Sequence, residues 1–446
     1  MQKSFKLLRI TISLIIVFGF VGGVVGFVRA EKLTLEECIA LAKKGNLELR
    51  SAYNSYRSSK ENVWQSYSGI LPRIDSWISG SRTVIGPTGY LRWDQNTSRF
   101  VNASTGISVS KSYSAGISLS ETIFNGGANI YNIYSAKADK ESKRYQYIKT
   151  EKDIIYSVKE KYYNLLKAKM MVDVRKDGVK RGEEQLKYAQ SRYELGAASI
   201  SDVLKAKVQY GQDKLDLVDA KNTYNLAKAD LNNILNRPID SDIEPVDEFT
   251  TPKVNYDYES AYKAALERQP ILLQASQDLK TAKYRKLSAR GGWLPSLSVR
   301  GSYAWNDESL HLGKIFDENY QWNITGTLNF NIFEGFQTKA QYNSSKIAYK
   351  MAEDNFHSVR NAVALEVMQA YLGIQKSREN MKLTEESRKS AEEDYNIVKE
   401  KYTLGAATIL DLIDAEVSYK QAEANHIQAL YDYNLAVSQL EKAIGL

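Results

Sequence analysis

Few residues in this chain have a type and spacing that could support catalysis or metal binding. The three histidines, His311, His357 and His426, are far apart, and none lies at metal-ligand spacing from another ligand. The sequence contains no glycine-rich phosphate loop, nucleophile elbow or dinucleotide fingerprint. Acidic residues are numerous, but charged positions on amphipathic helices usually face water. We therefore expect no enzyme, no cofactor and no metal site.

Two short motifs mark the starts of helices. In Ser199-x-x-Asp202 and Thr408-x-x-Asp411 a hydroxyl is followed three positions later by a carboxylate, which is the pattern of a capping box with Asp in place of Glu. A glycine stands three positions before each motif, and glycine commonly ends a helix in the left-handed conformation. The sequence therefore predicts two tight helical hairpins.

These hairpins belong to a long internal duplication. The segment 192–202 reappears at 401–411, displaced by 209 positions, and two further motifs recur at that displacement. An upstream match is displaced by 223 positions instead, so the first copy holds a 14-residue insertion between Pro72 and Ile123. Copies this long do not form a short-period solenoid, so we expect two large repeats that complete one another.

Long helices are expected in both copies. The seven prolines leave 88–237 and 296–446 free of this helix breaker. Apolar residues spaced by threes and fours form one face, as in a coiled coil: Ile155, Val158, Tyr162 and Leu165. A continuous helix through this region would be about 100 Å long. The returning helices are about half as long, so we expect helices near 43–67 and 261–289 to cover the remaining halves.

The sequence also predicts strands of a membrane barrel. Residues 320–332 alternate apolar and uncharged polar side chains, 297–305 repeat this pattern, and 74–81 and 107–123 follow it less cleanly. A strand of about 10 such residues crosses a bilayer. Five of the six tryptophans lie in these strands, between them or just before them, as in an aromatic girdle: Trp77, Trp93, Trp293, Trp305 and Trp322. Four strands cannot close a barrel, so several chains must share one. A soluble sheet with one wet face would show the same period.

Composition narrows the class of protein further. Residues 1–30 are basic and then apolar, and they end in a small residue, as in a signal peptide cleaved after Ala30; an uncleaved anchor remains open. A mean hydropathy of −0.43 and 25% charged residues exclude a helical multi-span membrane protein. Residues 31–446 hold 56 basic and 53 acidic side chains, which does not indicate nucleic-acid binding. The single cysteine, Cys38, lies in a periodic apolar segment and is expected to be structural.

The order of these motifs resembles the TolC-like outer membrane efflux protein family. The resemblance rests on the Leu-Thr-Leu-Glu-Glu segment at Leu33, two Leu-Pro strand entries, Phe-x-Gly exits at Phe124 and Phe333, and the two Tyr-x-Leu-Gly hairpins. It implies a mainly α fold with a β part. In this fold, long coiled-coil helices form a periplasmic α-barrel in a homotrimer, and four strands per chain contribute to a 12-stranded transmembrane β-barrel in outer membrane lipid.

The function implied by the resemblance is that of a passive exit duct. Such a duct serves a tripartite efflux pump or a type I secretion system, together with a periplasmic adaptor and an inner membrane transporter, in the outer membrane of a Gram-negative-type cell. A periplasmic coiled-coil scaffold without transport is the alternative that the residues leave open.

The resemblance also implies a periplasmic gate at the hairpins. Its residues would be Asp411, Asp414 and Tyr402 in the second hairpin and Ser201 and Asp202 in the first. Asp411 and Asp414 are three positions apart, so their carboxylates share one helical face. Threefold symmetry would point six such carboxylates at one axis, where their crowding would raise their pKa values and attract cations. For the two aspartates in the capping motifs, ordinary helix capping explains the sequence equally well.

The hairpin tips are the expected contact with the adaptor, because small residues there allow close approach. These tip residues are Leu195, Gly196, Ala197, Ala198, Leu404, Gly405, Ala406 and Ala407. The last of them stands where the family can carry an arginine that helps to latch the closed state, which suggests a weaker latch here.

These observations divide the chain into a signal peptide at 1–30, a first repeat at 31–235, a connecting segment at 236–257 and a second repeat at 258–446. The first repeat is expected to hold strands at about 70–83 and 107–123, a long helix at 128–193, a hairpin at 194–200 and a helix at 201–235. The second is expected to hold strands at about 296–306 and 320–332, a long helix at 337–402, a hairpin at 403–408 and a helix at 409–444.

Overall fold

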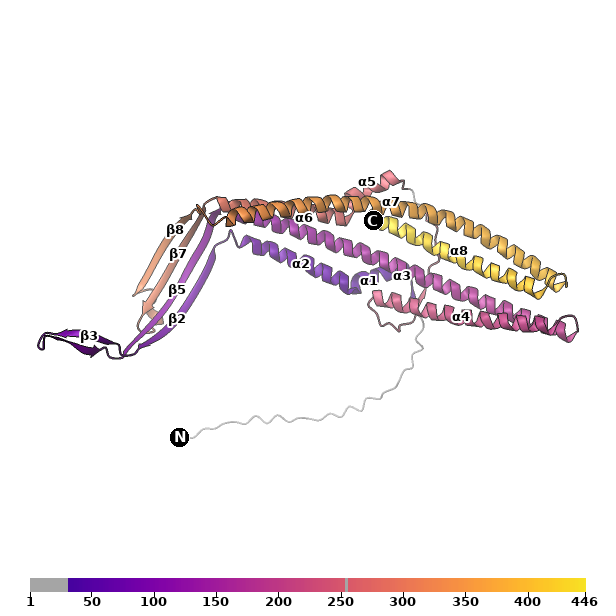
Figure 1. The fold of residues 1–446 in the computed structure, drawn as a ribbon, viewed down its shortest axis with the longest axis horizontal. Coiled ribbons are helices and arrows are strands. Elements are labelled where there is room, and N and C mark those ends of the chain that lie inside the picture. Colours follow the sequence, from indigo (N-terminus) through magenta and orange to yellow (C-terminus); the bar gives the residue numbers. More distant parts are fainter. Residues whose placement is uncertain (1–30, 253–255) are drawn as a thin grey trace, which may run out of the picture.

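The computed structural model describes residues 31–252 and 256–446. The predicted signal peptide therefore lies outside the described residues. The molecule is strongly elongated, with a β-sheet at one end and two helical hairpin tips at the other (Figure 1). We call these the sheet end and the tip end.

Two helices of 67 residues run along the molecule, α3 (Ala128–Glu194) and α7 (Gln337–Thr403). Both are rich in residues of high helix propensity and contain no proline, which permits the length of about 100 Å. Each begins after a residue in the left-handed conformation, Gly127 at φ 79° and Phe336 at φ 69°. The expected ranges, 128–193 and 337–402, end one residue earlier than these helices.

Shorter helices pack along the two long ones. Two return from the tips, α4 (Ile200–Ile234) and α8 (Ile409–Ala443), and α2 (Leu47–Tyr67) and α6 (Pro270–Arg290) accompany the halves nearer the sheet. The remaining helical elements are α1 (Leu35–Gly45), α5 (Tyr258–Arg268) and the 3-10 turns η1 (Gly291–Trp293) and η2 (Leu312–Lys314). None of the helices in the described part of the chain has an apolar stretch long enough to cross a membrane.

Four strands form the main sheet, in the order β2 (Arg73–Ile85), β5 (Ser108–Asn125), β7 (Ser296–Asp307) and β8 (Tyr320–Asn329). All neighbouring pairs are antiparallel. β2 and β8 are the two edges, and neither has a second partner among the described residues. Two short strands near the middle of the molecule, β1 (Glu31–Leu33) and β6 (Ile243–Pro245), pair in parallel.

The sequence did not predict a second hairpin, β3 (Gly89–Asp94) with β4 (Arg99–Ser104), which extends β2 and β5 beyond the main sheet (Figure 1). It accounts for most of the extra residues of the first copy. The expected strand at 70–83 begins at Arg73, since residues 68–71 form a turn and a bend, and the expected strand at 320–332 ends at Asn329.

The periodic residues of the long helices form the cores near the middle of the molecule. Val158, Tyr162 and Leu165 are buried against α1, α4 and β6, and the Tyr162 hydroxyl donates to the Leu33 carbonyl at 3.0 Å. Cys38 is fully buried in this cluster, and burial raises the pKa of its thiol to about 12. The cysteine is therefore structural, as its sequence context predicts.

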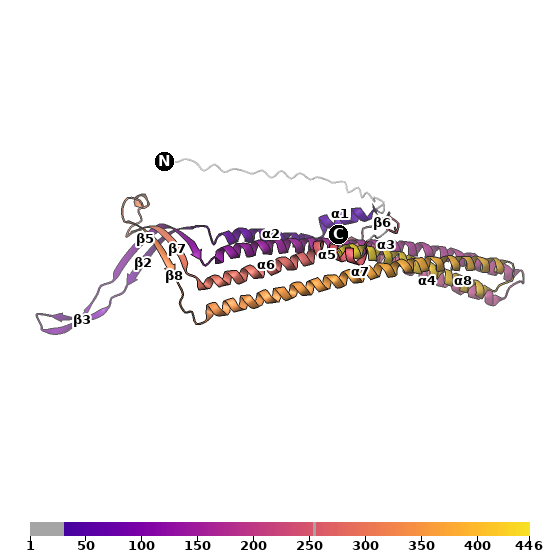
Figure 2. The ribbon, with the colours of Figure 1, turned by 90° about the horizontal axis from the view of Figure 1, so that it is seen from above.

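The two long helices differ at the sheet end. α3 lies between α2 and α6, whereas α7 packs on α6 and extends along one side of the molecule (Figure 2). α3 already buries Ala138 and Ser142, but α7 has no buried residue before Val363. The residues of α7 that correspond to that buried pair in the duplication, Ile347 and Met351, are 59% and 67% exposed. An apolar side of α7 is thus without a partner among the described residues.

Candidate functional site

The candidate site lies at the tip end, where both hairpins turn. Gly196 (φ 72°) and Gly405 (φ 79°) follow the helix ends in the left-handed conformation. The Ala197 amide donates to the Arg192 carbonyl at 2.8 Å, and the Ala406 amide makes the equivalent bond in the second hairpin. These are Schellman turns, which satisfy the last carbonyls of each helix. The glycines are needed because a side chain with a Cβ is strained at such φ values.

Both predicted capping boxes are present. The Ser199 amide donates to the Asp202 carboxylate at 3.1 Å and the Thr408 amide to Asp411 at 2.8 Å, and the return bonds are 3.2 Å in both. The hydrogen bonds from Thr408 hold the pKa of Asp411 below its usual value in the single chain. Asp202 and Asp411 therefore cap α4 and α8.

The remaining gate candidates lie in two different environments. Asp414, one turn beyond Asp411, is exposed, and so is Ser201 at the start of α4. Tyr402 is buried, at 4% exposure, and its ring lies edge-on to Tyr188 with a centroid distance of 5.5 Å. Burial raises the pKa of Tyr402. Within one chain its ring thus belongs to the packing between the hairpins, whereas Asp411 and Asp414 are exposed and Asp202 is half-buried.

Arg192 ties the two tips together, and sequence reasoning missed it. Its guanidinium donates to the Tyr402 carbonyl at 3.1 Å and to the Ala197 carbonyl at 3.3 Å, and it lies 5.5 Å from the centre of the Tyr402 ring. The sequence feature that could have identified it is the duplication, in which Arg192 corresponds to Lys401. A guanidinium can donate in two directions at once, which an ammonium does less readily.

The apices of the two tips expose apolar side chains. Leu195 is 83% exposed and Leu404 84%, and the small residues beside them are exposed or half-buried. Behind the apices, residues from all four helices pack into one cluster: Ala189, Val203, Ala206, Tyr395, Tyr402, Ile409, Leu412 and Ala415. The two hairpins of one chain therefore form a single packed body.

A buried ionic cluster lies behind this packing, and the sequence did not predict it either. The Lys420 ammonium lies 2.8 Å from both the Asp213 and the Glu416 carboxylates, and Glu416 also accepts from Arg181 at 3.2 Å and Gln185 at 2.6 Å. Burial is the main cause that raises the pKa of Asp213, against the effect of Lys420. The cluster joins α3, α4 and α8.

Two glycines of α3 make room for these charges. A Cβ at Gly182 would lie 2.5 Å from Asp213 Oδ2, and one at Gly178 would lie 3.0 Å from Lys420 Cε. These mid-helix glycines weaken the helix locally. Their position against the cluster explains why they are there.

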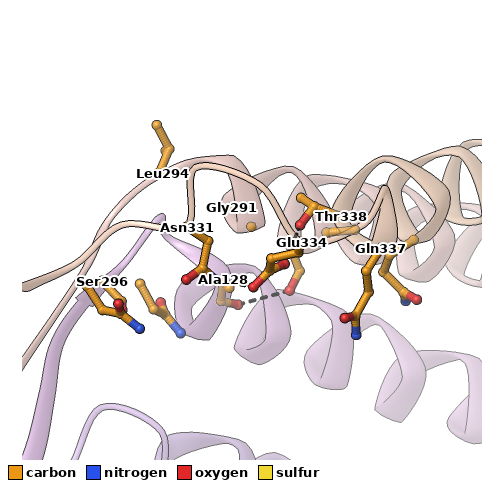
Figure 3. Close-up of a pocket in the computed structure, with 14 residues that line it drawn as sticks. Ala128, Gly291, Leu294, Ser296, Asn331, Glu334, Gln337 and Thr338 are labelled. Atoms are coloured by element: carbon orange, nitrogen blue, oxygen red, sulfur yellow. Dashed lines mark hydrogen bonds between the residues drawn. The ribbon is translucent and has the colours of Figure 1, made fainter.

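A polar cavity of about 450 Å³ lies where the sheet meets the helices (Figure 3). It is lined by Asn331, Gln337 and Thr338 among others, and Thr338 donates to the Glu334 carboxylate at 2.7 Å. Glu334 is its single ionisable side chain, so it offers no acid–base pair. Among the described residues, no group of His, Cys, Asp and Glu could hold a metal ion.

The family is decided by comparison with known proteins. The model of the family "Outer membrane efflux protein" matches residues 38–237 and 261–446, which is most of the chain. The chain belongs to the outer membrane efflux protein family. As a member of that family it is an outer membrane protein that extends into the periplasm.

Individual members of the family are similar over most of their length. Outer membrane protein TolC of Vibrio cholerae is 25% identical over 87% of this chain and 89% of its own length, and TolC of Escherichia coli is 24% identical over 91% and 80%. The solved CmeC outer membrane channel of Campylobacter jejuni matches with a TM-score of 0.81 at 21% identity, covering 92% of this chain and 85% of that one. The family and the fold are thus those of channel proteins rather than of enzymes.

Proposed function

We propose that three copies of this chain close into one passive exit duct, in which the sheets form a 12-stranded barrel and the long helices an α-barrel across the periplasm. The observation that carries this proposal is the incompleteness of the single chain. Its sheet has two open edges, β2 and β8, and α7 has an apolar side without a partner among the described residues. Open edges are not tolerated in lipid, where unpaired backbone groups cost several kcal/mol each.

The duct would serve a tripartite efflux pump or a type I secretion system, with energy from an inner membrane transporter. The exposed tips with Leu195 and Leu404 would meet a periplasmic adaptor, since apolar and small residues there permit close packing. Adaptor crosslinks found only along the middle of the helices would contradict this part of the proposal.

The gate would be formed by the exposed acidic residues of the second tip. Asp411 and Asp414 from three chains would place six carboxylates around the axis, a ring that attracts cations. Tyr402, Ser201 and Asp202 would contribute as packing and polar neighbours. Because Asp411 also caps α8, Asp414→Ala tests the ring without removing a cap. We expect reduced cation block and altered single-channel conductance, and the ring is rejected if both stay unchanged.

The duct itself is tested by purifying the mature chain from membranes and recording it in planar bilayers. We expect a heat-modifiable trimer that conducts ions without an energy source. Recovery as a monomer in the soluble periplasmic fraction, with no conductance, would instead favour a scaffold without transport.

A further inference from the structure

The outer end of the β2–β5 hairpin carries two like charges that face each other. Arg82 of β2 and Lys111 of β5 are direct partners in the antiparallel register, and both are exposed. Like charges directly opposite one another destabilise a sheet. Arg73, at the other end of β2, has an ion-pair partner in Asp75 at 3.0 Å, but no ion pair among the described residues includes Arg82 or Lys111.

The two basic residues lie on the apolar face of the sheet. By alternation they share that face with Ile74 and Ile78 of β2 and Ile117 of β5, whereas Ser79 and Ser114 hydrogen-bond on the opposite face at 2.8 Å. Arg82 lies eight residues beyond Ile74, about 26 Å along the strand. In a strand tilted by about 40° this is a rise of about 20 Å, most of the roughly 25 Å height of the apolar band of a membrane barrel.

The neighbouring aromatic residue supports this depth. The Tyr113 ring lies over Gly80, one step inward from the basic pair, where a Cβ on the glycine would be 3.1 Å from the ring. Tyrosine is typical of the boundary between acyl chains and headgroups. The carboxylate of Asp307, opposite Tyr113, already accepts hydrogen bonds from the Ser309 amide at 3.2 Å and from the Asn319 side chain at 3.4 Å, so it is engaged outside the basic pair. Arg82 and Lys111 thus lie where headgroups begin.

The β3–β4 hairpin beyond them, which we call the arm, is both basic and amphipathic. Within residues 89–104 two side chains are basic, Arg92 and Arg99, and one, Asp94, is acidic. Trp93 and Phe100 lie opposite each other with ring centroids 5.0 Å apart, share a face with Leu91, and are 50% and 66% exposed. Apolar rings beside positive charge are typical of surfaces that bind anionic lipid.

We propose that this end of the hairpin binds phosphate groups of outer-leaflet lipid, with one phosphate between Arg82 and Lys111 and the apolar face of the arm in the headgroup layer. A bound phosphate would neutralise the two like charges and turn their repulsion into charge-assisted hydrogen bonds. The inference rests on the proposed membrane-spanning barrel.

Lipid retention by the full mature chain tests the basic pair. The chain is placed in phosphatidylcholine nanodiscs with bisphosphorylated lipid A or its dephosphorylated form, and retained lipid is measured by native mass spectrometry. For Arg82→Gln/Lys111→Gln we expect retention of the phosphorylated lipid to weaken by about thirtyfold, from about 1 kcal/mol per basic residue. Arg300→Gln, on the opposite face of β7, is the matched control and should retain lipid normally.

Three results would overturn the inference: unchanged retention by the double variant, equal retention of the dephosphorylated lipid by the wild type, or displacement by excess inorganic phosphate, which indicates a site for free anions. A photoreactive residue at Phe100 separates lipid from a second copy, because adducts to lipid support the assignment of the arm and adducts to another chain contradict it. Conductance is recorded in parallel. A wild type that conducts but retains no phosphorylated lipid contradicts this inference alone, whereas one that retains lipid but does not conduct contradicts the proposed duct.

Discussion

The two repeats contain the same elements but have different partners. In the first repeat, Gly126 turns from β5 into α3 against the backbone of Gly291, so that a Cβ there would lie 2.3 Å from the carbonyl oxygen. Its counterpart Gly335 has nothing within 4 Å of such a Cβ. The same contrast holds for α3, which is covered on two sides, and α7, which is covered on one. Among the described residues, the second repeat therefore has no counterpart of the partners that cover the first, and the proposed trimer would supply them from the first repeat of a neighbouring copy.

The largest expected effect comes from charging the open side of α7. Ile347→Asp/Met351→Asp should abolish the trimer, because each interface would bury carboxylates without partners at a cost of several kcal/mol. The oligomer is measured by heat-modifiable mobility and by sedimentation in detergent. Lys346→Glu, the neighbouring exposed position, is the control and should leave the trimer intact. A normal trimer in the double variant would contradict an interface on this side of α7.

The two repeats also differ at the tip end, in the buried ionic cluster. The duplication places Lys207 and Gly211 of α4 opposite Glu416 and Lys420 of α8, so the first repeat has no counterpart of the buried Glu416–Lys420 pair. Lys420→Met should destabilise α8 by about 3–5 kcal/mol, since two buried carboxylates lose their partner.

Hydrogen exchange of the α8 amides measures this loss. The matched control is Lys389→Met, which removes a surface ion pair with Glu385 at 3.3 Å and should cost about 0–1 kcal/mol. Equal effects of the two substitutions would show that the cluster does not hold α8 in place.

The paired glycines give a smaller but well-matched contrast. Gly126→Ala should destabilise the junction by about 1–3 kcal/mol through overpacking in addition to about 1–2 kcal/mol for a left-handed alanine. Gly335→Ala should cost only about 1–2 kcal/mol, that of a left-handed alanine, if no neighbouring chain packs against this residue. Thermal unfolding of the two variants compares them. If they are equally destabilised in the assembled protein, a neighbouring chain packs against Gly335 as closely as Gly291 packs against Gly126.

The smallest effect is a pH dependence of the pairing between α7 and α8. Hydrogen bonds from Arg388 are the main cause that lowers the pKa of Glu385 from 4.5 to about 2, and His426 lies 3.2 Å away. A carboxyl with a lowered pKa in the folded state contributes stability above its unfolded pKa, and that contribution is lost as the pH falls from about 4.5 to 2. Hydrogen exchange near Glu385 should show this loss, and Glu385→Gln should remove it.

Much of the fold was predictable because the sequence patterns that determine it are local and occur in both copies of the duplication. The absence of proline, the spacing of residues such as Val158 and Tyr162, and the glycines before the capping motifs set the long helices and their turns. The added hairpin β3–β4 was missed because each of its strands has six residues, so their alternation is too brief to detect.

The interactions at the tip end were less predictable because they join distant positions. Lys420 meets Asp213 across 207 residues, and nothing in the local sequence of either marks it as buried. Asp411 shows the opposite case, since its capping role follows from a motif of four residues. Its proposed role in a gate depends on symmetry between chains, which a motif within one chain does not specify.

The most direct test of the account is to identify what lies against the open side of α7 in the assembled protein. A photoreactive residue replaces Met351 in chains that are co-expressed with isotope-labelled copies, and the crosslinked peptides are sequenced. We predict mixed-isotope adducts between α7 of one chain and α2, residues 47–67, of another, in bands heavier than one chain. Adducts confined to single chains, or to lipid, would contradict the claim that the second repeat is completed by a neighbouring copy.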